Sequence, residues 1–289
     1  MSYTLFVDSG SNLPARKLQE LDIRVIPFHY ELDGQLIRCP DYPDGFDGHS
    51  YYDRLRAGAV VKTSLINTAD FCDAFRPVLE SGSDLMYVGL SSGISGTVQS
   101  ANLAAEQLME EFPGRQVRIV DSMGAGLGTG LLACKAADYR DDGLTVDQAA
   151  IKLSYDRENL CEYFTVDDLM FLKRTGRVSG VTAAIGSMLQ IKPMLRGDES
   201  GKIVVCGKIR GRKRAIAELT DIYAKKAVNP AAQRVAISHG DCLEEAQRLA
   251  DKLREIAPPK ELILSMHEPL TGAHVGPGML ALFFFGSGR

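Results

Sequence analysis

The fold is decided by one stretch, Asp84-Leu-Met-Tyr-Val-Gly-Leu-Ser-Ser-Gly-Ile-Ser-Gly-Thr97. Its first part has the apolar composition of a buried strand, and a loop with three serines and two glycines follows. After the loop, apolar residues recur near helical spacing, at Ala101, Ala104, Leu108 and Phe112. The free N–H groups and the dipole of a helix N-terminus favour an anion. The stretch therefore predicts a strand, an anion-binding loop and a helix.

The same order of elements surrounds this stretch in the first half of the chain. Strands expected over residues 3–7 and 117–120 both end in polar residues, at 8–12 and 121–122. A strand over 24–32 is expected to form a hairpin with 35–38, and Asn67 is expected to cap a helix. Strands that alternate with helices predict a parallel sheet flanked by helices, with ligands beyond the carboxyl ends of the strands.

The second half has a different pattern, which begins near residue 160. Strands are expected over 161–166, 192–195, 202–209, 234–239 and 261–266, and the apolar segment 276–286 is expected to be a buried strand or an end packed on the core. Helices are expected near 168–175, 181–190, 212–227 and 243–256. A hairpin pattern at 195–204 indicates antiparallel pairing. We therefore expect an α/β domain over residues 1–158, an α+β domain over 159–289, and a ligand between them.

Charge and cysteine content exclude several classes of protein. The formal net charge is −4, from 33 basic and 37 acidic residues, so the whole molecule is not expected to bind nucleic acid. Residues 173–214 are basic and predict a local anionic partner, such as a phosphate, a membrane surface or an acidic protein. The six cysteines are scattered, and no apolar run approaches the roughly 18 residues of a membrane span. We expect a cytoplasmic protein with reduced thiols and no structural metal.

A serine hydrolase is the alternative that the opening stretch allows. Gly89-Leu-Ser-Ser-Gly93 fits the G-x-S-x-G pattern, and Ser91 has potential partners in Asp121 and either His239 or His274. In the hydrolase pattern, however, the serine leads directly into its helix, whereas residues 94–96 intervene here. The glycines at 124–130 do not have dinucleotide-binding spacing, and we expect them to permit close backbone packing.

Six short motifs resemble the DegV family, in family order along essentially the whole chain. They are Val7-Asp-Ser-Gly-Ser-Asn-Leu-Pro14, Lys62-Thr-Ser64, Leu90-Ser-Ser-Gly-Ile-Ser-Gly-Thr97, Ile119-Val-Asp-Ser122, Gly176-Arg-Val-Ser179 and His274-Val-Gly-Pro-Gly278. The resemblance implies a non-enzymatic carrier that buries one long-chain fatty acid between two domains. A separate fatty acid kinase subunit would phosphorylate the bound carboxylate and so feed phospholipid synthesis. The resemblance implies no catalytic residue, metal or cofactor in this chain.

The resemblance also assigns roles to particular residues. Those expected to bind the fatty-acid carboxylate are Thr63, Ser95, Gly96 and His274. Those expected as pocket neighbours are Ser9, Ser64, Ser92, Gly124, Gly126 and Gly128, with the glycines leaving room for the acyl tail. Those expected to form a basic face for the kinase subunit or an anionic membrane are Arg177, Arg210, Arg212 and Arg214.

The chain departs from the family pattern at two of these motifs. Leu65-Ile66 replaces the usual Gln-Pro after Thr63-Ser64, and Thr175-Gly176 replaces a double glycine. We expect a more apolar wall beside Thr63 as a result. Burial of an acyl tail gains about 0.8 kcal/mol per methylene, so a long chain contributes roughly 10 kcal/mol.

Overall fold

One parallel sheet forms in the first half of the chain, with strand order β2-β1-β6-β7. Its strands are β1 (Thr4–Asp8), β2 (Ile23–Ile26), β6 (Leu85–Gly89) and β7 (Val117–Asp121). The computed structural model describes residues 3–179 and 191–289. Strand β6 is buried along its whole length, which suits a parallel sheet covered on both faces. The predicted parallel sheet is therefore confirmed.

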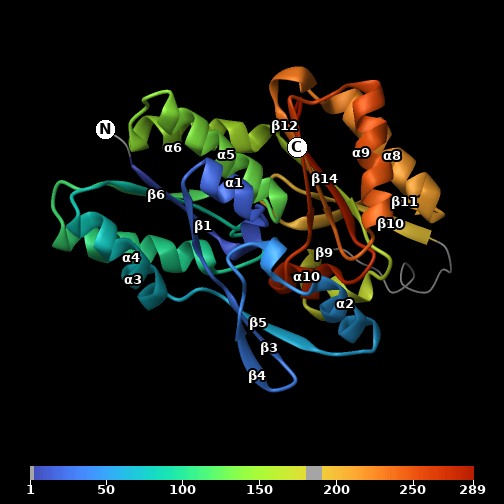
Figure 1. Ribbon diagram of the computed structural model, residues 1–289, viewed down its shortest axis with the longest axis horizontal. Helices are drawn as coiled ribbons and strands as arrows, with labels where there is room; N and C mark the ends of the chain where they lie inside the picture. The colour runs from blue at the N-terminus through green and yellow to red at the C-terminus, as the bar shows by residue number, and fades with distance from the viewer. Residues whose placement is uncertain (1–2, 180–190) are drawn as a thin grey trace.

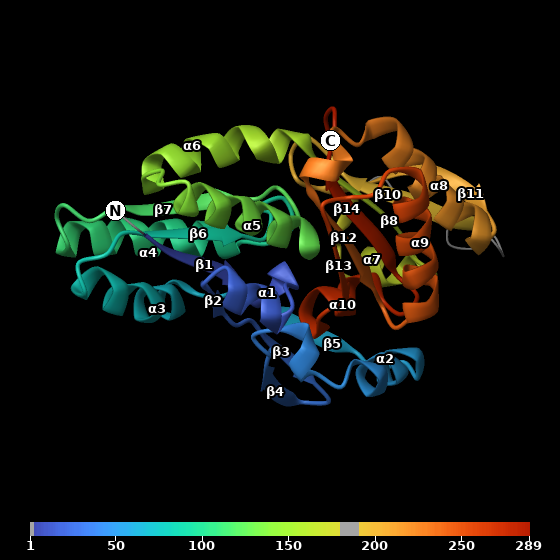
Figure 2. The same ribbon diagram turned by 45° about the horizontal axis from the view of Figure 1, so that its top comes forward.

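Helices cover both faces of this sheet. Helices α3 (Thr68–Glu80) and α4 (Thr97–Glu111) pack on one face, and α5 (Leu127–Asp141) and α6 (Val146–Asp156) on the other (Figures 1 and 2). The predicted cap of α3 is confirmed, because the Asn67 side chain accepts the N–H of Asp70 at 3.0 Å.

Side chains of the central strands alternate between the two faces, as the period of a strand requires. Phe6 and Tyr87 belong to the apolar cluster that contains Phe71 of α3. Val7 and Val88 belong to the cluster that contains α5. The continuous apolar runs in the sequence thus serve two separate cores.

The second half builds a seven-stranded sheet of order β13-β12-β14-β8-β10-β11-β9. Its strands are β8 (Leu160–Thr165), β9 (Val178–Ser179), β10 (Ile191–Gly197), β11 (Ile203–Arg210), β12 (Arg234–His239), β13 (Glu261–Met266) and β14 (Leu280–Phe285). The predicted hairpin is confirmed as the antiparallel pair β10–β11. The pairs β12–β13 and β11–β9 are parallel. The helix expected over 181–190 lies outside the described residues.

Helix α5 packs against both sheets, so it forms the common layer between the two halves. Helices α8 (Arg212–Lys226) and α9 (Leu243–Ile256) cover the outer face of the large sheet (Figure 2). The chain passes from the parallel sheet to the seven-stranded sheet between β7 and β8, near the predicted domain boundary at residues 158/159. That boundary itself stays a prediction.

A small antiparallel sheet joins the two halves below α5. It has the order β4-β3-β5, with β3 (His29–Leu32), β4 (Gln35–Arg38) and β5 (Val61–Ser64). The single strand predicted over 24–32 is wrong, since Pro27 lacks a backbone N–H and the chain leaves one sheet for another there. The hairpin with 35–38 is confirmed.

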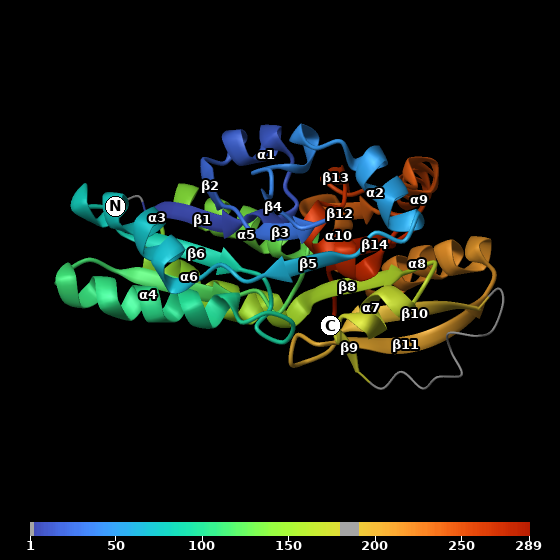
Figure 3. The ribbon, with the colours of Figure 1, turned by 90° about the horizontal axis from the view of Figure 1, so that it is seen from below.

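The small sheet lies against α10 (Pro269–Val275), which also contacts α2 (Gly48–Arg56) and α7 (Met170–Arg174) (Figure 3). This packing brings β5 from the first half against α10 from the second. The remaining short elements are α1 (Ala15–Glu20), η1 (Ser9–Ser11), η2 (Pro43–Gly45), η3 (Arg157–Asn159) and η4 (Pro230–Ala232).

Candidate ligand-binding site

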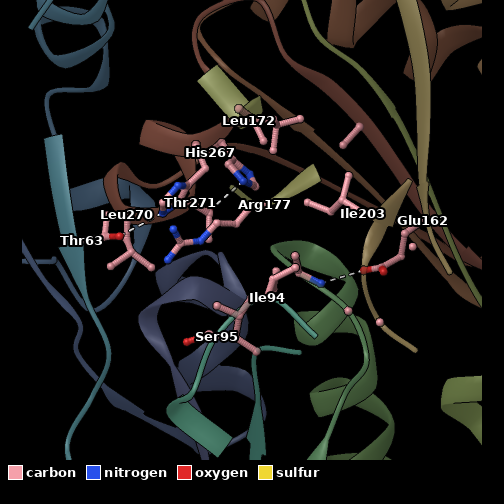
Figure 4. Close-up of a pocket in the computed structure, with 18 of the residues that line it drawn as sticks. Thr63, Ile94, Ser95, Glu162, Leu172, Arg177, Ile203, His267, Leu270 and Thr271 are labelled. Atoms are coloured by element: carbon pink, nitrogen blue, oxygen red, sulfur yellow. Dashed lines mark hydrogen bonds between the residues drawn. The ribbon is translucent and has the colours of Figure 1, made fainter. Parts of the chain in front are cut away.

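A cavity of about 430 Å³ lies where the two halves meet, beyond the carboxyl ends of β2, β6 and β7. A volume of this size is within the range of small-ligand sites. Much of its wall is apolar and comes from both halves of the chain: Phe28, Leu90, Phe164, Leu172, Ile203 and Phe283. Figure 4 shows Thr63 toward one side of this space and Glu162 toward the other. The cavity therefore combines a polar edge with an apolar interior.

Thr63 and His274 meet at this polar edge, although they lie 211 residues apart in the sequence. Strand β5 carries Thr63, the last turn of α10 carries His274, and Thr63 Oγ1 lies 3.0 Å from His274 Nε2. Burial, and then the positive charge of Arg177, lower the pKa of His274 to about 4. The imidazole is therefore neutral at pH 7. With its proton on Nε2 it donates to Thr63, which leaves the Thr63 hydroxyl hydrogen free for a ligand.

Ser95 and Gly96 lie on the same cavity, at the N-terminus of α4. Ser95 Oγ lies 2.8 Å from Thr97 Oγ1 and accepts the N–H of Thr97 at 3.3 Å. Gly96 is the N-cap residue, so the first N–H groups of α4 lack helical partners there. The Leu65 side chain lies against Gly96, because a Cβ built on Gly96 would lie 3.2 Å from Leu65 Cδ2. The four residues predicted to bind a carboxylate thus line one cavity.

Helix α10, which carries His274, was not predicted. Glu268 caps this short helix by accepting the N–H groups of Leu270 and Thr271 at 2.6 and 2.7 Å. A glycine ends the helix: Gly276 is its C-cap residue and has a φ of 77°, which residues with a side chain rarely adopt. His274 is therefore held by a capped helix rather than by a flexible turn.

Two of the six predicted pocket neighbours, Ser64 and Gly124, line the cavity. Ser9 lies outside the lining and accepts the N–H of Phe28 through its hydroxyl at 3.1 Å. Ser92 points outward, where its hydroxyl donates to Asp121 at 2.5 Å. These two serines support neighbouring loops.

Gly126 and Gly128 make room for protein side chains rather than for an acyl tail, which corrects their expected role, and Gly124, which lines the cavity, also packs against a side chain. A Cβ on Gly128 would lie 1.9 Å from Glu162 Oε1, and a Cβ on Gly124 would lie 2.6 Å from the same atom. A Cβ on Gly126 would lie 2.7 Å from His267 Cε1. The glycines thus let the second half of the chain approach α5 closely, which agrees with the close packing expected of such a pattern.

The structure also corrects two members of the predicted basic face. The Arg177 side chain lines the cavity near His274. Arg212 is only 16% exposed and donates to Glu245 at 2.6 Å. Arg210 and Arg214 are exposed, as expected. A cation inside the cavity was not foreseen because sequence spacing says nothing about which side of a turn faces a distant helix.

Three buried polar residues of the cavity were missed in the sequence. Glu162 accepts the Ala125 N–H at 2.9 Å and pairs with Arg289 at 3.1 Å. His267 and Thr271 lie on the α10 side, with His267 Nε2 2.8 Å from Thr271 Oγ1. The apolar pattern of β8 hid Glu162, since a single acid in a buried strand carries no periodic signal.

Ser91 does not have the surroundings of a catalytic serine. It is buried, and its hydroxyl donates to the carbonyl of Gly201 at 2.8 Å. In residues 3–179 and 191–289, no histidine forms a hydrogen bond with it; His274 binds Thr63, and His239 accepts the N–H of Cys242. Asp121 is engaged by Ser92 and Met123. The hydrolase alternative has no support from this geometry.

One group of potential metal ligands, His49, Asp53 and Asp241, occurs among the residues described. A guanidinium already occupies it: Arg56 donates to Asp53 at 2.7 Å and to Asp241 at 2.6 Å. This surface cluster is therefore an ion-pair network with its own cation.

The buried histidine outside the cavity, His239, gives a testable pH dependence. Burial lowers its pKa to about 4 from 6.5. Between these values the unfolded chain binds a proton that the folded chain does not, so the free energy of unfolding falls as the pH falls. We compare the parent protein with His239→Asn, whose amide can still accept the Cys242 N–H. As the pH falls from 6.5 to 4, we expect the free energy of unfolding to fall by roughly 3 kcal/mol less in the variant than in the parent protein. Urea unfolding at a series of pH values measures the difference.

Other buried groups titrate in both proteins. Burial lowers the pKa of His267 to about 3 and raises that of Glu268 to about 7, and the two act on stability with opposite signs. The effect of burial on both groups is the same in the variant and the parent protein, whereas the smaller effect of the His239 charge on the pKa of His267 is absent from the variant. Parallel pH profiles for the two proteins would contradict the prediction.

In the part of the chain that the structure describes, no helix has the length and apolar character needed to cross a membrane.

Comparisons with known proteins agree with this architecture. The model of a family described as "Uncharacterised protein, DegV family" matches residues 2–287. A DegV domain-containing protein of Clostridium perfringens is 37% identical over 288 residues, which are 98% of this chain and 97% of the relative. A DegV family protein from Thermus thermophilus, described as fatty acid binding, has a TM-score of 0.86 and 29% identity, with 99% of this chain and 100% of that chain covered.

A second solved structure, DegV from Bacillus subtilis, is described as a fatty acid binding protein. It has a TM-score of 0.84 and 29% identity, with 98% of each chain covered. The resemblance seen in the sequence motifs is thus confirmed over the whole length, and the chain belongs to the DegV family.

Proposed function

We propose that this protein binds one long-chain fatty acid in the cavity, with the carboxylate at the edge formed by Thr63, Ser95, Gly96 and His274. The observation that carries the proposal is the Thr63–His274 hydrogen bond at the edge of an apolar cavity. Two related structures, from Thermus thermophilus and Bacillus subtilis, are described as fatty-acid-binding proteins.

The polar edge offers what a carboxylate needs when it leaves water. An unpaired buried carboxylate costs several kcal/mol, so donors and a cation must face it. Thr63 and Ser95 supply hydroxyl groups, and Gly96 lies at the positive end of α4. Arg177 adds a positive charge on the same cavity. A neutral His274 holds the Thr63 hydroxyl in a donating orientation.

The bound carboxylate is positioned for another protein's chemistry. Gly96 and Ser64 line the cavity and are exposed, so the carboxylate edge is open to solvent. We infer that a separate fatty acid kinase subunit phosphorylates the carboxylate in the cytoplasm and that the acyl phosphate feeds phospholipid synthesis. In this proposal the chain is a carrier without a catalytic residue or cofactor of its own.

The exposed cations Arg210 and Arg214, near the end of β11 and the start of α8, are the proposed docking face for the kinase subunit or, transiently, an anionic membrane. Cations in the first turn of α8 oppose the helix dipole, so their presence favours an external anionic partner.

The experiment combines binding with phosphorylation. Delipidated protein is titrated with stearic acid by calorimetry, and the complex is then given ATP and the fatty acid kinase subunit. We expect Arg210→Glu with Arg214→Glu to slow acyl phosphate formation at least tenfold while the affinity for stearic acid stays unchanged. The same charge reversals at Lys252 and Arg254, exposed on α9, are the matched control.

The binding titration tests the carrier function, and the phosphorylation assay tests the docking face. An absence of stearic acid binding would contradict the carrier function. Normal binding with an unaffected phosphorylation rate in the Arg210 and Arg214 variant would contradict only the docking face.

A further inference from the structure

Two buried histidine nitrogens of the cavity, Nδ1 of His274 and Nδ1 of His267, have no hydrogen-bond partner among the described residues. The first belongs to the carboxylate edge, whereas the second has no role in the proposed carboxylate site. His267 lines the cavity, and only 4% of its surface is exposed. Its Nε2 lies 2.8 Å from Thr271 Oγ1, but its Nδ1 has no hydrogen-bond partner among the described residues. A buried polar atom without a partner loses its hydrogen bonds to water and gains none in return. Such an atom in a ligand cavity points to a polar group on the ligand.

The hydrogen bonds around Thr271 fix the chemical character of this free nitrogen. Both carboxylate oxygens of Glu268 accept backbone N–H groups, from Leu270 and Thr271, and Oε1 also accepts the Thr271 hydroxyl. Because the Thr271 hydroxyl donates its one hydrogen to Glu268, it accepts from His267. The His267 proton therefore lies on Nε2. Its Nδ1 is left as a hydrogen-bond acceptor that lacks a donor.

The imidazole of His267 lies away from the carboxylate edge. Thr271 precedes His274 by almost one turn of α10, about 5 Å, and His267 contacts Thr271 rather than Thr63. Figure 4 shows His267 above the space between Thr63 and Glu162. Apolar residues such as Phe164, Leu172 and Ile203 line the same space. An acyl chain that starts at Thr63 would therefore pass the imidazole with carbons beyond its first few, that is, with its mid-chain positions.

We propose that the cavity selects an acyl chain with a mid-chain hydroxyl group, whose O–H donates to Nδ1 of His267. This inference rests on the proposed fatty-acid binding and names the class of acyl chain that the site takes. A hydroxyl group supplies the hydrogen-bond donor that Nδ1 of His267 lacks. A ketone at the same carbon supplies only an acceptor, which cannot pair with the acceptor Nδ1. A hydroxyl beside the carboxylate would lie too near Thr63 to reach His267.

The test compares four ligands on the delipidated protein by calorimetry: stearic acid, its mid-chain hydroxy and keto derivatives, and its α-hydroxy derivative. We expect the mid-chain hydroxy acid to bind at least threefold more tightly than stearic acid, as a net buried hydrogen bond predicts. The keto and α-hydroxy acids should gain nothing. In His267→Phe, stearic acid should bind more tightly than the mid-chain hydroxy acid, because the ligand hydroxyl is then buried against an apolar side chain without a partner.

A matched control is His239→Asn, which alters a buried histidine outside the cavity lining and should keep the preference. Equal or weaker binding of the hydroxy acid by the parent protein would overturn the inference, and this comparison needs no variant to fold. A preference that survives in folded His267→Phe would also overturn it. If stearic acid binds but the hydroxy acid is not preferred, only this inference fails and the proposed function stands. If none of the four acids binds, the proposed function and this inference both fail.

Discussion

Alanine at both Thr63 and Ser95 is expected to weaken the binding of stearic acid by roughly 100-fold, since each lost donor to a buried carboxylate costs about 1–3 kcal/mol. Both hydroxyl groups lie on the cavity, and Thr63 is held by His274 at 3.0 Å. The apolar residues of the wall are unchanged in this variant, so the loss reports mainly on the carboxylate. Calorimetric titration of delipidated protein measures it.

The matched control for this variant is Ser92→Ala. Ser92 belongs to the same loop as Ser95, but it points outward and donates to Asp121. It should leave the affinity for stearic acid unchanged. An unchanged affinity in the Thr63 and Ser95 double variant would refute the assigned carboxylate site, even if the acyl chain still binds elsewhere in the cavity.

The second large effect concerns stability. We expect Glu162→Gln to lower the free energy of unfolding by about 3 kcal/mol, because removal of one partner from a buried ion pair leaves the other charge uncompensated. Glu162 and Arg289 have side chains that are 7% and 3% exposed, and they lie 3.1 Å apart. The carbonyls of Met123 and Arg157 still accept from Arg289, but they carry no negative charge. Urea unfolding measures the loss.

Glu199→Gln provides the same chemical change on the surface. Glu199 is 77% exposed and lies 3.4 Å from Arg196, so its replacement should have no measurable effect on stability. A Glu162→Gln variant as stable as the parent protein would contradict the prediction that this buried ion pair stabilises the fold.

The parallel sheet and its polar edge could be predicted because the deciding signals are local. A buried strand, a serine- and glycine-rich loop and a helix follow one another within Asp84-to-Thr97, and β6 and α4 form there. The hairpin β3–β4 likewise follows from the turn residues Asp33 and Gly34. The strand before it was misjudged, because an apolar pattern cannot show that Pro27 moves the chain from one sheet to another.

The site was only partly predictable, because its pieces meet through tertiary packing. Thr63 and His274 were linked by the resemblance to the DegV family, since nothing in the spacing of residues 211 apart indicates contact. Arg177 was assigned to the outer surface because charge alone does not give orientation. The glycines before α5 were read as space for a ligand, whereas Glu162 and His267, from distant segments, fill that space.

The most direct test of the carrier function is extraction of the purified protein, followed by mass spectrometry of the lipid fraction. We predict close to one long-chain fatty acid per protein, and much less from the Thr63→Ala and Ser95→Ala double variant purified in parallel. A parent protein that yields no stoichiometric acyl chain, and that takes up none when incubated with stearic acid, would contradict the account.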